Sequence, residues 1–201
     1  MRASAASSTE REIGPIWSSE DAKAIADLAR ENNVPVMSCS AIRYAAGIAE
    51  LHDEAPVVSC EAFGPAAILE DYPGLFWYGV HSAEVLFSLM GRGCASVQVT
   101  VGEQMDLIAG TWADGRIGTV RGFRAPDLKS FGATVITDKE VRHGLVRKDP
   151  PYYALMLREI MAFFRTGVAP IELEETVEIM AFLHAANQGR DDSGTAVQLA
   201  T

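Results

Sequence analysis

The second half of the chain carries four short strand-like segments in succession, separated by brief turns. They lie at 96–101, 105–113, 116–123 and 131–137. Between the middle two stands Asp114-Gly115, a dipeptide that favours a tight hairpin because its residues accept positive φ. Strands joined by short turns pair antiparallel, and such sheets are commonly covered on one face only. The pattern therefore predicts an open, mainly antiparallel sheet.

Helical patterns account for much of the remaining chain. Ser18, with Asp21 three positions on, forms a capping signal for a helix that runs to about residue 33. The other elements we expect are a short buried strand at 34–37, a helix from Ser40 to about His52, a strand at 57–63, a helix from about Tyr78, a helix capped by Asp149 with Pro150 in its first turn, and a helix at 171–187. The fold class is therefore α+β, with helices backing the sheet.

The faces of the expected helices also follow from apolar spacing. The helix after Pro150 should turn Tyr153, Met156, Leu157, Ile160 and Phe164 inward, and the last helix should bury Leu173, Val177, Met180 and Leu183. Along the chain we expect a disordered leader at 1–17, a small α/β unit at 18–53 and an α+β domain at 54–201.

An aromatic cluster followed by glycine and histidine occupies residues 76–84, Phe-Trp-Tyr-Gly-Val-His-Ser-Ala-Glu. In a helix that begins near Tyr78, His81 and Glu84 share a face because they lie three residues apart. One interpretation is a pocket wall that offers an imidazole and a carboxylate to a polar carbon substrate. The other is a helix N-terminus whose histidine is simply hydrogen-bonded.

The same segment resembles the substrate-site motif D-x-G-x-H-x-x-D of the Gfo/Idh/MocA oxidoreductases, which use NAD or NADP on sugars, inositols and related polyols. Gly79, His81 and Glu84 match the later motif positions, and Trp77 replaces the first acidic residue, as in a branch that reads W/Y-Y-G-[VI]-H. Three further segments resemble the family in the same order. Residues 19–38 resemble the end of its dinucleotide domain, 40–44 the crossing into the second domain, and 110–118 a hairpin of its open sheet.

The resemblance implies roles for individual residues. His81 would abstract or deliver the hydroxyl proton of a sugar or polyol, because an imidazole titrates near neutral pH. The substrate-binding residues that it implies are Glu84, Tyr78, Trp77 and Arg43. A salt bridge for Arg43 and a half-buried structural ring for Tyr78 are the alternatives. NAD or NADP would carry the redox chemistry.

Two motifs of the family are missing. No G-x-G-x-x-G loop, which cradles a dinucleotide pyrophosphate, occurs in the chain. Where the family has E-K-P, the chain reads Glu12-Ile13-Gly14-Pro15, so Pro15 is the matching cofactor-site residue and the lysine is replaced. Residues 18–53 would then be the end of a dinucleotide domain, and we expect the chain alone to be inactive. A non-catalytic ligand-binding or oligomerisation module and a nucleotide-independent isomerase or dehydratase are the other hypotheses.

Charge and composition exclude several other classes. A net charge of −10 leaves no basic field for a nucleic-acid partner. The chain has three cysteines and four histidines, none at metal-ligand spacing, so we expect no metal site. No uncharged apolar run reaches the ~18 residues of a membrane span, and no secretory signal begins the chain. We therefore expect a cytoplasmic protein.

The open face of the predicted sheet is the expected site of self-association. Large residues on the hairpin strands, Trp112, Ile117 and Phe123, would form an uncovered apolar surface. Such a surface is a liability in a monomer, so a homo-oligomer paired through this face is the physical expectation. The resemblance to the family implies the same arrangement.

Overall fold

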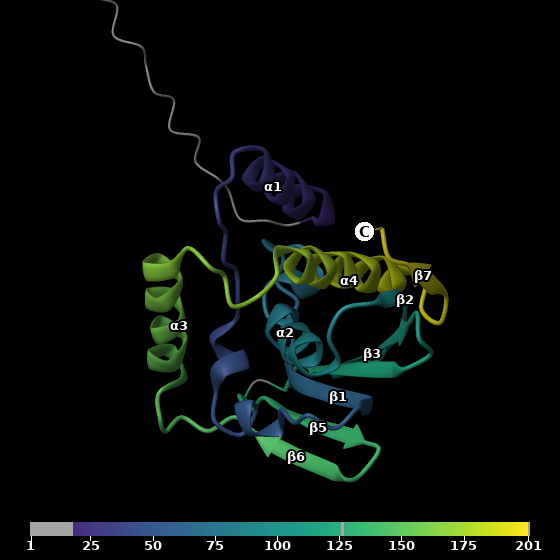
Figure 1. Ribbon diagram of the computed structural model, residues 1–201. Helices are drawn as coiled ribbons and strands as arrows, with labels where there is room; N and C mark the ends of the chain where they lie inside the picture. Colours follow the sequence, from purple (N-terminus) through teal and green to yellow (C-terminus); the bar gives the residue numbers. More distant parts are fainter. Residues whose placement is uncertain (1–17, 126, 201) are drawn as a thin grey trace, which may run out of the picture.

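The computed structural model describes residues 18–125 and 127–200. Its helices are α1 Ser19–Glu31, α2 Gly79–Met90, α3 Tyr152–Thr166 and α4 Leu173–Asp191, with short 3₁₀ turns η1 Ala41–Tyr44, η2 Ala49–Leu51 and η3 Gly74–Phe76. Its strands are β1 Val57–Pro65, β2 Cys94–Val101, β3 Met105–Trp112, β4 Ile117–Phe123, β5 Gly132–Thr137, β6 Val141–Leu145 and β7 Ala196–Gln198. Figure 1 shows the helices gathered to one side of the strands.

All seven strands form one sheet in the order β6-β5-β1-β4-β3-β2-β7. Neighbouring strands pair antiparallel except for β1 and β4, which are parallel. The α+β class and the mainly antiparallel sheet are thus confirmed, as is the hairpin at Asp114-Gly115, where Gly115 alone takes positive φ. The strands β6 and β7 were not predicted. His143 lies in β6 and is exposed.

Helices α2 and α4 cover one face of the sheet, and the main core lies between them and the strands. Trp112 is the largest side chain in this core and is only 1% exposed, so its predicted place on the open face is wrong. Alternation along β3 places Trp112 on the same face as Ile108. Its indole Nε1 donates a 3.0 Å hydrogen bond to the carbonyl of Gly91, and a Cβ at Gly118 would lie 2.9 Å from the indole ring.

The opposite face of the sheet carries exposed apolar side chains, as predicted. Ile117 is 51% exposed on β4, and Ile136, Val141 and Leu145 are exposed on β5 and β6. Phe123 is half-buried at the end of β4. Polar residues such as Thr119 and Glu61 alternate with them on the same surface.

The N-terminal part agrees with the sequence only at its first helix. Ser18 Oγ accepts the Asp21 amide at 3.0 Å, as the capping signal predicts, and α1 packs on α4. The strand expected at 34–37 is wrong, because this segment pairs with no strand of the described chain and Val34 is exposed. In Figure 1 it runs as a long connection from α1 to η1.

The single helix expected from Ser40 to His52 is also wrong. Two short 3₁₀ turns replace it, because Ala45 leaves the helical region and Gly47 takes a φ of 90°. A side chain at Gly47 would collide with the carbonyl of Leu145 on β6. The close approach to β6 therefore requires both glycine and an interrupted helix.

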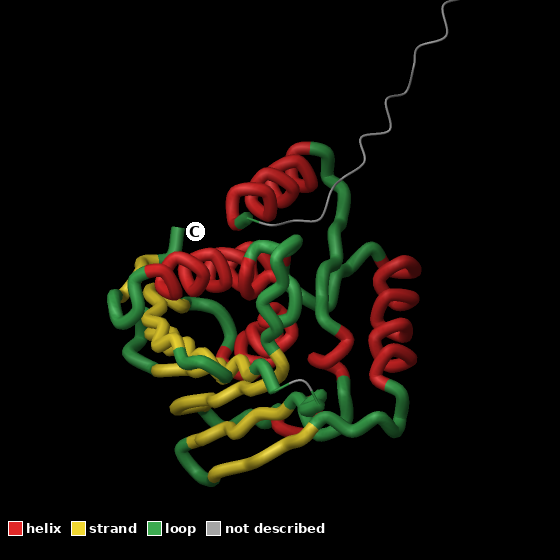
Figure 2. The backbone as a smooth tube through the Cα atoms, turned by 180° about the vertical axis from the view of Figure 1, so that it is seen from behind, coloured by secondary structure: helices red, strands yellow, loops and turns green. Residues whose placement is uncertain are grey.

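Helix α3 begins two residues later than predicted, with Pro151 as its N-cap residue, and none of its residues is fully buried. Figure 2 shows α3 at the side of the sheet, which explains why none of its residues is fully buried. Of its predicted inward face, Tyr153, Leu157 and Phe164 are exposed, whereas Met156 and Ile160 are half-buried. Helix α4 extends beyond Asn187 to Asp191. Of its predicted inward residues Leu183 is buried, whereas Leu173, Val177 and Met180 are only half-buried.

Substitution at Trp112 tests the position of the core. Trp112→Ala should lower the free energy of unfolding by about 3–5 kcal/mol, because it leaves a large cavity and an unpaired Gly91 carbonyl. The matched change Ile117→Ala, on the open face, should cost less than about 1 kcal/mol. Urea unfolding measures both. Equal losses for the two variants would contradict the assignment of faces.

Candidate functional site

His81 lies in the first turn of α2 and lines a cavity of about 260 Å³ between α2, η1 and α3. Its Nδ1 lies 2.8 Å from the Ser40 hydroxyl oxygen. The same oxygen accepts the Ile42 amide at 3.2 Å, as the cap of η1. Because the Ser40 oxygen is fixed by the η1 backbone, it also fixes the direction of the imidazole.

Two aromatic rings hold His81 from either side. The rings of Tyr78 and Phe131 meet the imidazole edge-on, at centroid distances of 5.6 and 5.7 Å. Burial lowers the pKa of His81 below its ordinary value of 6.5, so the ring is neutral at pH 7. No group in the described chain hydrogen-bonds Nε2. A neutral imidazole with one ring nitrogen anchored and the other free can accept or return a proton.

Glu84 lies one turn beyond His81 but does not line the cavity. It is only 4% exposed, and its carboxylate accepts a 2.9 Å hydrogen bond from Arg43 Nε. Arg43 also forms an ion pair with Glu175 of α4. Burial raises the pKa of the Glu84 carboxyl, and the Arg43 guanidinium opposes that rise. One buried cation thus links η1, α2 and α4 through two carboxylates.

The structure therefore separates the predicted site residues into those that line the cavity and those that do not. His81 and Tyr78 meet at the cavity, whereas Arg43 and Glu84 pair behind it. Trp77 is partly exposed and packs its ring 4.1 Å from that of Tyr72. Pro15 lies outside the described residues.

Sequence reasoning missed several residues that line the cavity. Phe131, Tyr152 and Tyr153 reach it from the loop before β5 and from the first turn of α3. Ser40 was recognised only as a cap. Its spacing from His81 along the chain gave no signal, because tertiary packing alone brings η1 against α2.

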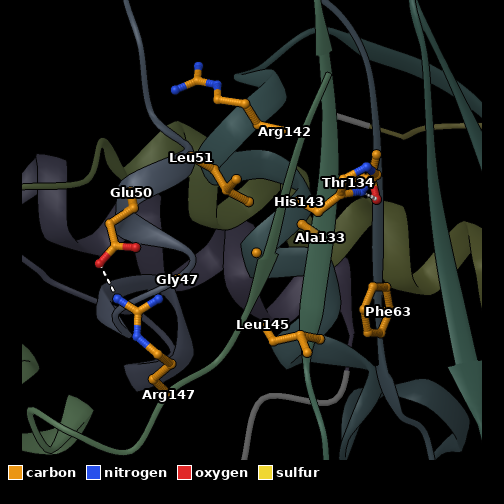
Figure 3. A pocket seen from close by; sticks show the side chains of 11 residues that line it. Gly47, Glu50, Leu51, Phe63, Ala133, Thr134, Arg142, His143, Leu145 and Arg147 are labelled. Atoms are coloured by element: carbon orange, nitrogen blue, oxygen red, sulfur yellow. Dashed lines mark hydrogen bonds and ion pairs between the residues drawn. The ribbon is translucent and has the colours of Figure 1, made fainter. Parts of the chain in front are cut away.

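A second cavity, of about 720 Å³, lies at the edge of the sheet between η2 and β6 (Figure 3). Its charged groups are engaged with one another. Arg147 points toward Glu50, with which it forms an ion pair, and Arg142 lies 3.1 Å from Asp53. His143 contacts the Thr134 hydroxyl through Nδ1 at 2.9 Å. His143, like His81, has no hydrogen-bond partner at Nε2 among the described residues, but His143 is exposed on β6 whereas His81 is half-buried among aromatic rings.

Other chemistries find little support in the described residues. Burial raises the pKa of Cys60 and of Cys94 to about 12, and that of Cys39 also rises, so all three are thiols at neutral pH. Within the described ranges no cluster of three His, Cys, Asp or Glu side chains could hold a metal ion. No helix among residues 18–125 and 127–200 has the length and apolar character to cross a membrane.

Several solved structures share this fold. GenD2 from gentamicin A biosynthesis, in complex with NAD, has a TM-score of 0.74 at 16% identity, covering 92% of this chain and 70% of its own. A putative myo-inositol dehydrogenase from Sinorhizobium meliloti gives 0.73 at 15% identity, covering 92% and 71%. The Lactobacillus casei myo-inositol dehydrogenase, in complex with NAD(H) and myo-inositol, gives 0.72 at 14%, covering 92% and 68%.

No protein-family model and no curated protein matches the sequence. The fold expected from the motifs is nevertheless confirmed, because the structural neighbours are Gfo/Idh/MocA-type dehydrogenases. The chain has the fold of the C-terminal part of those proteins, over about seven tenths of their length. Sequence identities near 15% establish a shared fold and nothing more.

The lowered pKa of His81 makes folding stability depend on pH. Below pH 6.5 the unfolded chain binds a proton that the folded chain resists, so acidification destabilises the fold. Between pH 7.5 and 5.5 the wild type should therefore lose more unfolding free energy than His81→Gln, by up to about 1.4 kcal/mol per pH unit within the window. His52, whose pKa burial also lowers, is present in both proteins and cancels. Identical pH profiles would contradict this account.

The buried ion pairs of Arg43 give a second prediction. Arg43→Met should lower the free energy of unfolding by about 3–5 kcal/mol, because it leaves the buried Glu84 and the partly buried Glu175 without a partner. Arg147→Met removes an exposed ion pair with Glu50 and should cost at most about 1 kcal/mol. Guanidinium unfolding of both variants at pH 7 makes the comparison. A loss as small for Arg43 as for Arg147 would refute the proposed link.

Proposed function

We propose that this chain is the substrate-binding part of a Gfo/Idh/MocA-type oxidoreductase that acts on a hydroxyl group of a sugar or polyol. The observation that carries the proposal is His81, which lines a cavity, has Nδ1 anchored to Ser40 and has no hydrogen-bond partner at Nε2 among the described residues. The structural neighbours are NAD-dependent sugar and polyol dehydrogenases, which supports the reaction class.

Proton transfer is the step that the described residues can serve. Nε2 of His81 accepts the proton of a substrate hydroxyl while Ser40 holds Nδ1, and it returns a proton in the reverse direction. The Tyr78 hydroxyl orients the substrate at the cavity wall, and Trp77 borders the same helix start. Arg43 and Glu84 act as positioning residues, because their ion pair fixes η1 against α2.

NAD or NADP is the cofactor of the proposed reaction, but the described residues do not fit its phosphates. Phosphate groups bind helix N-termini that lack negative charge and follow glycine-rich loops. The first turns of α1 and α4 are acidic, and although those of α2 and α3 carry no acidic residue, no G-x-G-x-x-G loop precedes any of the four helices. We therefore assign no described residue to the dinucleotide.

The second candidate function is a non-catalytic module that binds a polyol or assembles through its sheet. The missing G-x-G-x-x-G loop favours it, because the sequence then offers no glycine-rich cradle for a dinucleotide pyrophosphate. In either case we propose a homo-oligomer paired through the open face, where Ile117, Val141 and Leu145 are more than half exposed. Three unpaired cysteines fit a reducing compartment, and we propose the cytoplasm.

Ligand binding and turnover measurements test the proposed function. The purified chain is offered a panel of neutral sugars and polyols, first alone and then with NAD⁺ or NADP⁺. We expect saturable polyol binding, seen as shifts of the His81 ring protons, and no quenching of tryptophan fluorescence by NADH or NADPH.

If turnover occurs, His81→Gln should lower kcat by about 10²–10⁴, the usual contribution of a general base. His143→Gln, an exposed histidine on β6, is the matched control and should leave kcat unchanged. Turnover that survives His81→Gln would refute the role of His81. Absence of polyol binding would leave only the assembly module.

A further inference from the structure

The walls of the His81 cavity are apolar and aromatic. Tyr78, Phe131, Tyr152 and Tyr153 surround the imidazole, and no lysine, arginine, aspartate or glutamate of the described chain lines the cavity. The nearby charges of Arg43, Glu84 and Glu175 are consumed in mutual ion pairs. A charged ligand here would lose its hydration without gaining a counter-ion, which is unfavourable.

A neighbouring apolar cavity, the α3 cavity, has a volume of about 350 Å³ and continues along α3 from the His81 cavity. The two share Cys39 and Met156 as a common wall. Beyond this wall lie Ile160, Phe163 and Phe164 of α3, so the lining becomes more apolar with distance from His81. Methionine is unbranched and adaptable, and Met156 can yield to a ligand that spans both cavities.

We propose that the substrate is an uncharged ring alcohol that carries an apolar substituent. The ring and its reacting hydroxyl occupy the cavity at His81 Nε2, and the substituent enters the cavity beyond Met156. This inference rests on the proposed function, because it names the substrate class of the same site. It makes Tyr153, Met156 and Ile160 specificity-determining residues that touch the ligand.

The small number of hydrogen-bonding groups in the cavity supports this substrate class. The aromatic cavity offers His81 Nε2, the hydroxyls of three tyrosines, and the Ser40 hydroxyl, which already contacts His81 and the Ile42 amide. These groups are too few to pair with every hydroxyl of a polyol such as an inositol. Each buried hydroxyl without a partner reduces affinity. An apolar substituent, in contrast, gains from leaving water for the cavity beyond Met156.

Three matched glucosides test the proposal. Methyl β-D-glucopyranoside, phenyl β-D-glucopyranoside and methyl β-D-glucuronide differ only in the apolar group or in the charge. Binding to the full chain is followed by the NMR shifts of the His81 ring protons, which are assigned with His81→Gln. The phenyl compound should bind at least about tenfold more tightly than the methyl compound, and the glucuronide more weakly than either.

A substitution that fills the α3 cavity measures what this cavity contributes to the affinity. Ile160→Trp should lower the affinity for phenyl glucoside to about that for methyl glucoside. Met161→Trp, one position along α3 but 52% exposed, is the matched control and should change neither affinity. Thermal unfolding of both variants establishes that they are folded.

The outcomes distinguish the inference from the function on which it rests. Equal affinities for the phenyl and methyl compounds, or tighter binding of the glucuronide, would overturn the substrate class but keep a sugar site at His81. An Ile160→Trp variant that still binds the phenyl compound more tightly than the methyl compound would overturn the role of the α3 cavity. No His81 shift with any of the three glucosides would overturn both the inference and the proposed function.

Discussion

The ion pairs of Arg43 are the interaction on which the arrangement of the site depends. Arg43 lies in η1, and it binds Glu84 on α2 and Glu175 on α4 in a largely buried setting. Ser40 at the start of η1 and His81 on α2 are therefore held at hydrogen-bond distance. A single guanidinium with five donors can serve two carboxylates at once, which a lysine could not do with the same geometry. Removal of this cation would release the contact that directs the imidazole.

Much of the fold was readable because strand alternation and turn chemistry are local signals. The hairpin at Asp114-Gly115, the Ser18 cap and the start of the helix near Tyr78 all follow from neighbours in sequence. The elements that sequence reasoning missed depend on tertiary contacts. Gly47 breaks the expected helix because β6 approaches it, and Trp112 turns inward because α2 and α4 cover that face.

Sequence patterns indicated the centre of the candidate site but not its walls. His81 and Tyr78 were recognised from an aromatic–glycine–histidine pattern, and the structure places both at one cavity. Glu84 shares the helix with His81, but the buried Arg43 binds its carboxylate, which periodicity along the chain could not reveal. Tyr152, from a helix some seventy residues later in the sequence, forms another wall. The result is a cavity around one histidine that no lysine, arginine, aspartate or glutamate of the described chain lines, in a protein whose net charge is −10.

The central claim is that His81 is a neutral imidazole held through Nδ1, with Nε2 free for a substrate. Long-range ¹H–¹⁵N NMR of the four histidines, with pH as the variable, tests it most directly. The account predicts that His81 stays neutral at pH 7 and titrates below 6.5, and that Ser40→Ala alters its Nδ1 signal. A doubly protonated His81 ring at pH 7, or a Nδ1 signal that ignores the loss of Ser40, would contradict the account.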